Sequence, residues 1–352
     1  MVLLDRLGSW GLHKKIEQAM KLLTFVPDSD RLAVPLLGVL IDDDHTVVNL
    51  QAGRQVMAGA PEPFFADMLA FLDAGEAAQE AAENVRDFVC TQRPPETTYP
   101  LSQVVLLSPV PRPRSIRDCL VFEQHLIQAT RTVVRWRSPL LANLDTWVEK
   151  LRGRPLFSPP KVWYDFPVYY KGNTFSVVGT NTEIHWPSYT EKLDYELEFG
   201  IFIGKTGRNI TQSEARNHIA GYTLYNDFSA RDIQVREMRC SLGPAKGKDF
   251  DTGNAIGPYL VTPDQVPEPY NLTMSARVNG EEWSRGNSAS MHFTFEEIIA
   301  YISRDETLYP GEFIGSGTVG GGCGLESDRW LKRGDVVELE VESLGVLRNI
   351  II

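Results

Sequence analysis

Asp194-Tyr-Glu-Leu-Glu-Phe-Gly200 runs directly into the apolar Ile201-Phe-Ile203, a pattern typical of a strand in a large sheet. Successive side chains of a strand point to opposite faces, so Asp194, Glu196 and Glu198 share one face. Two or three carboxylates on one face offer only oxygen ligands, which suit Mg²⁺, Mn²⁺ or Ca²⁺. The stretch is therefore a candidate site for a hard divalent cation.

The same alternation has a second interpretation, a half-exposed strand with a solvated acidic face. Val337-Glu-Leu-Glu-Val-Glu342 repeats the pattern near the end of the chain. There we expect an ordinary strand whose glutamates lie in water. Spacing alone does not choose between the two interpretations for residues 194–200, so the choice depends on the residues that accompany them.

The length of 352 residues indicates more than one small core. The proline-broken segment 104–113 marks a boundary. We expect a small N-terminal α+β domain over residues 1–105 and a larger catalytic domain over residues 106–352. In the first domain the sequence predicts strands at 21–26, 35–41 and 46–50 and one helix over 63–89.

Composition narrows the classes of partner. The formal net charge of −11 disfavours nucleic acid and anionic membranes, so we expect a small-molecule substrate and neither of those partners. Residues 1–22 carry several charges, and we expect neither a signal peptide nor a membrane-spanning helix there. The cysteines form no CxxC pair, which indicates reduced thiols of a cytoplasmic protein rather than a disulfide frame or a zinc site; they are Cys90, Cys119, Cys240 and Cys323.

Two further segments carry candidate site residues. In 115–125 we expect Asp118 to cap a helix and His125 to lie two turns into it. A lone helical histidine is either a general base or a packed or solvated imidazole. The segment 166–173 contains Tyr170 beside small residues and a lysine, and it is either a loop that closes over a ligand or a plain surface loop.

Six motifs follow one another along the chain: Asp194-Tyr-Glu-Leu-Glu-Phe-Gly200, Asn226-Asp-Phe-Ser-Ala-Arg-Asp-Ile-Gln234, Gly247-Lys-Asp-Phe-Asp-Thr252 with Gly257-Pro258, Gly315-Ser-Gly-Thr318, Gly334-Asp-Val-Val-Glu338 and Gly345-Val-Leu-Arg-Asn349. Together they resemble the fumarylacetoacetate hydrolase family. The resemblance covers roughly residues 105 to 352.

The resemblance implies a mainly β, mixed β-roll catalytic domain, a homodimer, and a divalent cation, Mg²⁺ or alternatively Mn²⁺ or Ca²⁺. By position, the residues it implies as metal ligands are Asp118, Glu196, Glu198 and Asp227. It implies His125 as the base, Glu326 as the group that orients it, and Lys248 as a cation facing the substrate. The residues it implies near the substrate are Tyr170, Arg231, Gln234, Thr252 and Thr318.

The resemblance also implies a reaction. We expect His125 to activate water for hydrolysis of a C–C bond in a 1,3-dioxo acid, an acylpyruvate or fumarylacetoacetate-like substrate, with the cation and Lys248 stabilising the enolate that leaves. An alternative keeps the metal and the enolate but not the hydrolysis, as in an oxaloacetate-type decarboxylase or an enol–keto tautomerase, isomerase or hydratase. A third possibility is a metabolite-binding homologue without catalysis. The substrate stays open, because the loops in 136–187 match the family least.

Overall fold

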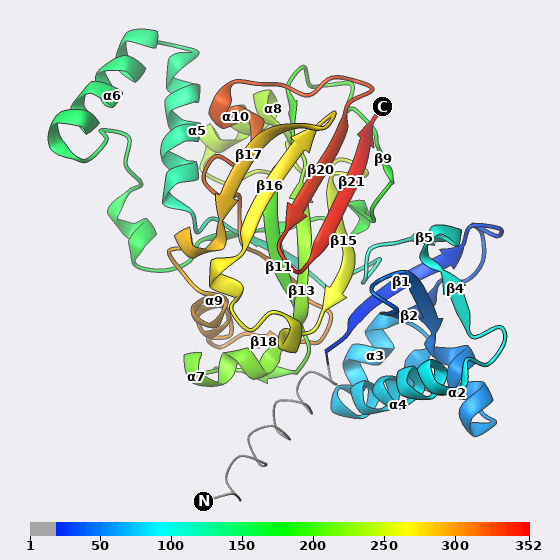
Figure 1. Cartoon of the computed structure of the whole chain (residues 1–352). Coiled ribbons are helices and arrows are strands. Elements are labelled where there is room, and N and C mark those ends of the chain that lie inside the picture. The colour runs from blue at the N-terminus through cyan, green and yellow to red at the C-terminus, as the bar shows by residue number, and fades with distance from the viewer. Residues whose placement is uncertain (1–18) are drawn as a thin grey trace, which may run out of the picture.

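The computed structural model describes residues 19–352 and is built around two sheets (Figure 1). The larger has twelve strands in the order β4-β3-β2-β1-β15-β13-β11-β19-β6-β7, with β5 paired to β1 and β8 to β15. Its strands are β1 (Lys21–Pro27), β2 (Leu36–Ile41), β3 (Thr46–Asn49), β4 (Thr98–Pro100), β5 (Val104–Leu106), β6 (Ile116–Cys119), β7 (Tyr169–Gly172), β8 (Val177–Val178), β11 (Leu197–Ile203), β13 (Ile219–Asp227), β15 (Asn254–Val261) and β19 (Phe313–Gly315).

The second sheet has five strands in the order β17-β16-β20-β21-β9 and lies in front of β11 and β13 (Figure 1). Its strands are β9 (Glu183–Ile184), β16 (Thr273–Val278), β17 (Glu281–Asn287), β20 (Val336–Val341) and β21 (Gly345–Ile351). Two short pairs complete the strands: β10 (Leu193–Asp194) with β14 (Ser229–Ala230), and β12 (Gly207–Arg208) with β18 (Thr307–Leu308). The helices are α2 (Leu50–Ala58), α3 (Met68–Ala74), α4 (Glu76–Gln92), α5 (Glu123–Arg135), α6 (Pro139–Arg152), α7 (Gln212–Ala215), α8 (Arg231–Glu237), α9 (Phe295–Ile302) and α10 (Gly324–Ser327).

Both faces of the larger sheet are buried at β11, which explains why this strand is apolar beyond Glu198. Phe199 and Ile201 face the five-stranded sheet and α9, where the Phe199 and Phe295 rings lie edge to face at 5.2 Å. Phe202 points to the opposite face and packs with Phe313 in the cluster that α3 and α4 cover. A strand buried on both sides needs apolar residues at every position, whereas β20 alternates buried and half-buried residues. The expectation of a half-exposed acidic strand in 337–342 is confirmed.

The N-terminal strands belong to the same sheet as the rest of the chain. β1 pairs antiparallel with β15, with Lys21 opposite Val261, while α2, α3 and α4 group beside β2 (Figure 1). The three strands expected at 21–26, 35–41 and 46–50 are confirmed within a residue or two. The division at residue 105 stays a prediction.

The single helix expected over 63–89 is wrong, because the chain breaks it at Gly75. Gly75 ends α3 and precedes α4 with φ 58° and ψ −129°, a conformation that residues with a Cβ rarely adopt. Pro63 begins a separate turn of 3₁₀ helix, and the Asp67 carboxylate then caps α3 by accepting from the Ala70 N–H at 2.8 Å. The helical periodicity of the apolar residues continues across Gly75, and for this reason the sequence predicted one helix rather than two.

Asp118 does not cap a helix. It lies in β6, and α5 begins only at Glu123, so His125 is in the first turn of α5 rather than two turns in. Asp118 therefore lies on the same sheet as Glu198.

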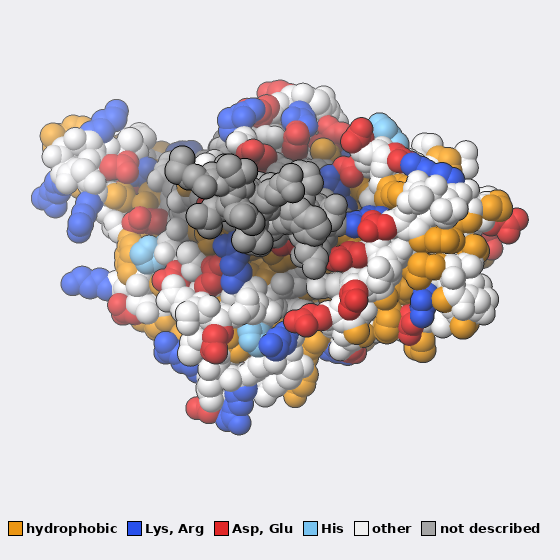
Figure 2. Space-filling view, turned by 60° about the horizontal axis from the view of Figure 1, so that its bottom comes forward, with side chains coloured by type: hydrophobic (Ala, Val, Ile, Leu, Met, Phe, Trp, Pro, Cys, Tyr) orange, Lys and Arg blue, Asp and Glu red, His pale blue; other side chains and the backbone are white. Residues whose placement is uncertain are grey.

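The surface shown in Figure 2 has acidic and basic side chains interspersed over its described part. No helix among residues 19–352 is long and apolar enough to cross a membrane. All four cysteines are free thiols. The expectation about residues 1–22 falls mostly on residues 1–18, which lie outside the described residues.

Candidate metal centre and active site

Three carboxylates from distant parts of the chain meet near the ends of neighbouring inner strands of the larger sheet. Asp118 comes from β6, Glu198 from β11 and Asp227 from the end of β13, and their oxygens lie within 4.8 Å of one another. β19 runs between β6 and β11, with Gly315 opposite Asp118. A Cβ at Gly315 would lie 2.4 Å from Asp118 Oδ1. The glycine of the 315–318 motif therefore lets the Asp118 carboxylate lie across β19.

The three-carboxylate group fits a divalent cation. Asp118, Glu198 and Asp227 are each at most 5% exposed. The Gly317 N–H points at Asp118 Oδ1 (3.2 Å) and Glu198 Oε2 (3.1 Å). Among the described residues, Asp227 Oδ1 is buried without any hydrogen-bond partner. A buried, unpaired carboxylate oxygen beside two further carboxylates is a donor set suited to Mg²⁺ or Mn²⁺.

The electrostatics of the group agree with this fit. Burial raises the pKa of Asp118 and of Glu198 well above their usual values, and repulsion among the carboxylates adds to the effect. Burial also raises the pKa of Asp227 to about 6, although Lys248 opposes the shift. Protons therefore compete with a cation for these carboxylates, and a bound cation would favour their ionised forms.

Glu196 lies beside the group but has different partners from those the resemblance implied. Its carboxylate accepts from the Lys248 ammonium, from Arg231 Nη2 at 2.8 Å and from Thr318 Oγ1 at 2.6 Å. Although burial opposes ionisation, Arg231 and Lys248 hold the pKa of Glu196 below its usual range. Lys248 also contacts Asp227 Oδ2, so it links Glu196 to the three-carboxylate group.

Arg231 is enclosed by protein groups. It donates through Nε to Asp194 Oδ2 (2.8 Å), through Nη2 to Glu196 and through Nη1 to Gln234 Oε1 (2.9 Å). Asp194 in turn accepts from the Gly324 and Leu325 N–H groups at the start of α10. Asp194 therefore anchors α10 and Arg231, and it is not part of the carboxylate group that its spacing predicted.

His125 and Glu326 meet at the edge of the same site. His125 Nδ1 lies 2.8 Å from Glu326 Oε1, and His125 Nε2 lies 3.8 Å from Glu196 Oε1. The Gly321 N–H donates to Glu326 Oε2 at 2.8 Å and fixes that carboxylate. A carboxylate that accepts from Nδ1–H leaves Nε2 free to accept a proton on the side of Glu196.

A cavity of about 640 Å³ opens over these groups. Tyr170 lines it and donates from its hydroxyl to Asp227 Oδ2 at 2.5 Å, and Thr318 and Gln234 also line it. Thr252 does not line this cavity. Its hydroxyl instead accepts a hydrogen bond from the His185 N–H at 3.0 Å. The remaining walls include residues that the sequence analysis did not single out, among them Leu120, Val168, Lys171, Met238, Leu242 and Pro244.

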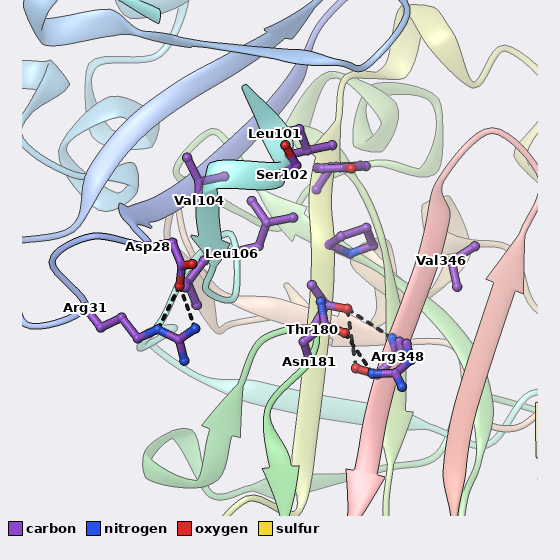
Figure 3. A pocket seen from close by; sticks show the side chains of 13 residues that line it. Asp28, Arg31, Leu101, Ser102, Val104, Leu106, Thr180, Asn181, Val346 and Arg348 are labelled. Carbon is purple, nitrogen blue, oxygen red and sulfur yellow. Dashed lines mark hydrogen bonds and ion pairs between the residues drawn. The ribbon is translucent and has the colours of Figure 1, made fainter. Parts of the chain in front are cut away.

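A second cavity, of about 560 Å³, lies between β5 and β21 (Figure 3). Its charged groups are already paired, because Arg31 donates to Asp28 and Arg348 Nη1 donates to Asn181 Oδ1 at 3.2 Å. Val104, Leu106 and Val346 supply an apolar wall. It offers no cluster of titratable groups comparable to the first cavity among the described residues, so we place the chemistry at the first.

Comparison with known proteins agrees with the motifs. The model of the fumarylacetoacetate hydrolase C-terminal family matches residues 142–352. The chain belongs to this family. It is an enzyme family, and the mixed α+β fold dominated by sheets is the one expected.

Relatives and solved structures extend the comparison over nearly the whole chain. Human oxaloacetate tautomerase FAHD2A, mitochondrial, is 32% identical over 331 residues, which cover 94% of this chain and 91% of that protein. A putative hydrolase of Burkholderia lata is 40% identical over 183 residues, 51% of this chain and 63% of that protein. The fold is shared with the fumarylacetoacetate hydrolase of Exiguobacterium antarcticum (TM-score 0.66, 24% identity, 94% of this chain and 99% of that chain). It is shared with a probable 2-hydroxyhepta-2,4-diene-1,7-dioate isomerase of Mycobacterium abscessus (TM-score 0.61, 25% identity, 94% and 98%). Since the human relative is named mitochondrial, a cytoplasmic location stays a prediction for this chain.

Proposed function

We propose that this member of the family is a metal-dependent tautomerase that interconverts the enol and keto forms of oxaloacetate or a similar 2-oxo diacid. One observation carries the proposal: a single histidine, oriented by one carboxylate, stands at the edge of a buried carboxylate group inside one cavity. Tautomerisation needs one group that takes a proton and returns it. The relative named an oxaloacetate tautomerase aligns over 94% of this chain and supports the choice of substrate class.

The cation belongs with Asp118, Glu198 and Asp227, and when bound it would supply positive charge for the oxygens of a 2-oxo acid. Lys248 compensates the charge of Glu196 and Asp227 at the same place. Tyr170 and Thr318 hold Asp227 and Glu196 by hydrogen bonds, so the acidic groups keep their positions when the charge of the substrate changes.

His125 moves the proton. Nδ1–H donates to Glu326, which leaves Nε2 to take the proton from the carbon next to the keto group. The C–H bond breaks, its electron pair forms the C=C bond of the enol, and the former carbonyl oxygen takes up the proton that Nε2 returns. The reverse sequence gives the keto form, so no water and no second substrate are consumed. A general base of this kind contributes about 10²–10⁴-fold to the rate.

The C–C hydrolysis implied by the motifs becomes the second candidate. It uses the same His125, with a water molecule as the nucleophile, and the Burkholderia relative named a putative hydrolase favours it. Hydrolysis requires a positioned water and a carbon leaving group in addition to the proton transfer.

Product analysis separates these reactions. Freshly dissolved enol oxaloacetate should lose its ultraviolet enol absorbance faster in the presence of the protein and Mg²⁺, with no release of CO₂. A tautomerase should leave an acylpyruvate uncleaved, whereas a hydrolase should give two acids. Cleavage of the acylpyruvate with no effect on the enol would reject the tautomerase proposal in favour of the hydrolase. Release of CO₂ would indicate a decarboxylase, and no turnover of either compound would favour a metabolite-binding homologue.

A further inference from the structure

A second group of ligand atoms lies on the far side of the His125 ring from the cavity. His125 Nδ1, Cys323 Sγ and Glu326 Oε1 all lie within 4.8 Å of one another. Sγ is 3.9 Å from Nδ1 and 3.6 Å from Oε1. The side chains of His125 and Glu326 are 7% and 4% exposed, and Cys323 is 2% exposed. The proposed function uses the histidine and the glutamate, but it gives the thiol no role.

We propose that His125, Cys323 and Glu326 form a binding site for Zn²⁺ or a similar borderline-soft cation, distinct from the carboxylate group, and that a cation bound there switches the enzyme off. The inhibition rests on the proposed function, whereas the binding does not. The absence of a CxxC pair led the sequence analysis to expect no zinc site, because the three ligands come from two helices and the loop before α10.

The distances fit a tetrahedral ion with only small movements. Zn²⁺ binds sulfur at about 2.3 Å and nitrogen or oxygen at about 2.0–2.2 Å, which puts tetrahedral donors about 3.3–3.6 Å apart. The two distances from Sγ, 3.9 and 3.6 Å, are already near this range. The pair at 2.8 Å has to open by about half an ångström. Three protein ligands leave the fourth position for water.

The backbone holds the ligands in place before any cation binds. Cys323 forms an antiparallel bridge with Glu196, and the next two N–H groups, of Gly324 and Leu325, donate to Asp194. Glu326 is held through its other oxygen by the Gly321 N–H. A preformed site loses less conformational freedom on binding than one that has to assemble.

Charge also balances at this site. Binding releases one proton to solvent, from the Cys323 thiol, while the single proton of the neutral His125 ring moves from Nδ1 to Nε2. A thiolate, a carboxylate and a neutral imidazole then surround a dication, so the buried group is neutral overall. Burial raises the pKa of the Cys323 thiol, while the nearby Arg231 favours the thiolate. Without a cation Cys323 is therefore a thiol. Because binding releases its proton, the affinity of the site for Zn²⁺ should increase with pH.

The bound cation would reverse the tautomer of His125. With Nδ1 bound to the metal, Glu326 no longer accepts a hydrogen bond from the ring, and the neutral imidazole carries its proton on Nε2. Nε2 then cannot take a proton from the substrate. The cation that activates the enzyme and the cation that inhibits it would occupy different sites, because hard cations prefer the all-oxygen group and borderline cations prefer sulfur and nitrogen.

Cobalt spectroscopy tests the binding without any substrate. The full chain, saturated with Mg²⁺, is titrated with Co²⁺, whose thiolate complexes give an intense near-ultraviolet charge-transfer absorption. We expect this absorption in the wild type and in the controls Cys90→Ser and Cys240→Ser, whose thiols are exposed and outside the site. We expect it to be absent from Cys323→Ser and from Cys323→Ala, the second variant guarding against misfolding of the first. A wild type without the absorption, or Cys323 variants that keep it, would overturn the proposal.

Inhibition is measured next, with Zn²⁺ in the presence of saturating Mg²⁺. We expect Zn²⁺ to abolish turnover of the enol by the wild type and to require at least about 10-fold more metal in Cys323→Ser, in line with the loss of one ligand. Equal inhibition of both proteins would place Zn²⁺ at the carboxylate group and overturn the regulatory proposal. A wild type that shows the cobalt absorption but never turns over oxaloacetate would instead reject the proposed function and leave the binding site standing.

Discussion

At the scale of single residues, the unpaired Asp227 Oδ1 is the atom that most clearly requires a ligand. A buried carboxylate oxygen without a hydrogen bond is costly, and Lys248 and Tyr170 both contact the other oxygen, Oδ2. A cation held by Oδ1 together with Asp118 and Glu198 would remove this cost. Asp227 thus links the polar network of the cavity to the cation.

The pKa of Asp227 gives the direction of a pH effect. Its value of about 6 lies above the ordinary value of an aspartate, so protons compete with the cation below about pH 6. Affinity for Mg²⁺ should be full above this pKa and should fall as the pH drops through it. Between about pH 7.5 and about pH 5 we expect the Kd for Mg²⁺ to rise by about 10-fold from this group alone. Calorimetric titration at the two pH values measures it, and an unchanged Kd would mean that Asp227 does not bind the ion.

His125→Gln tests the proton transfer itself. The glutamine fills similar space but cannot take up a proton, so we expect kcat to fall by about 10²–10⁴-fold. Binding of Mg²⁺ should be unchanged, because His125 is not in the three-carboxylate group. The matched control is His185→Gln, an exposed histidine that does not line the cavity. Turnover that survives in His125→Gln would assign the proton transfer to another group.

At the scale of the elements, the active site depends on how β10 and α10 are joined. Asp194 has no exposed surface, and it binds Arg231 and two N–H groups of α10, the helix that carries Glu326. The sequence analysis placed Asp194 with Glu196 and Glu198 because it assumed one regular strand. The chain instead leaves regular pairing between β10 and β11, so the alternation does not continue through residue 195.

Asp194→Asn should therefore destabilise the fold. It leaves Arg231 buried beside one carboxylate fewer, and breaking a buried ion pair costs about 3–5 kcal/mol. Urea unfolding measures the loss. Asp305→Asn is the control, since Asp305 is 86% exposed in its pair with Arg208, and it should change stability little. Equal stability of the two variants would show that Asp194 does not anchor α10.

The junction of α3 and α4 gives an independent test of the backbone. At Gly75 a Cβ would meet no atom within 4 Å, so any cost of Gly75→Ala comes from its φ of 58° and ψ of −129°. We expect a loss of about 1–3 kcal/mol by urea unfolding. Gly59→Ala, in the ordinary left-handed region at φ 74° and ψ 4°, should cost less, about 1 kcal/mol. A larger loss at Gly59 than at Gly75 would contradict this explanation.

Local signals in the sequence predicted part of the fold and part of the site. Short apolar runs predicted β1, β2 and β3, and alternation of apolar and acidic residues predicted β20, because the burial of a strand is reflected in its own residues. The pairing of β1 with β15, in which Lys21 and Val261 are 240 residues apart in sequence, left no local signal. For the site, the family resemblance implied Glu198, Asp227 and His125. They gave no indication of Cys323, which enters the site only because α5 and α10 pack together.

At the scale of the whole molecule, one sheet brings residues 118, 198 and 227 together, because β13, β11, β19 and β6 are neighbours in it. The five-stranded sheet and α9 cover one face of this sheet, and α3 and α4 cover part of the other (Figure 1). This enclosure leaves the three carboxylates at most 5% exposed, and so their interactions with a cation would be stronger than on a surface.

The homodimer implied by the resemblance stays a prediction. Light scattering of the purified full chain should give twice the mass of one chain. A mass of one chain at micromolar concentration would contradict it.

Counting bound metal tests the central claim most directly. Mn²⁺ is added to the metal-free protein, and the tightly bound ions per chain are counted by paramagnetic resonance. We predict one ion for the wild type, and none for Asp118→Asn, Glu198→Gln or Asp227→Asn. The control is Glu338→Gln on β20, which has the same strand alternation but faces solvent, and it should keep the ion. One tightly bound ion in all four variants would contradict the account, because three carboxylates that share a cation cannot each be dispensable.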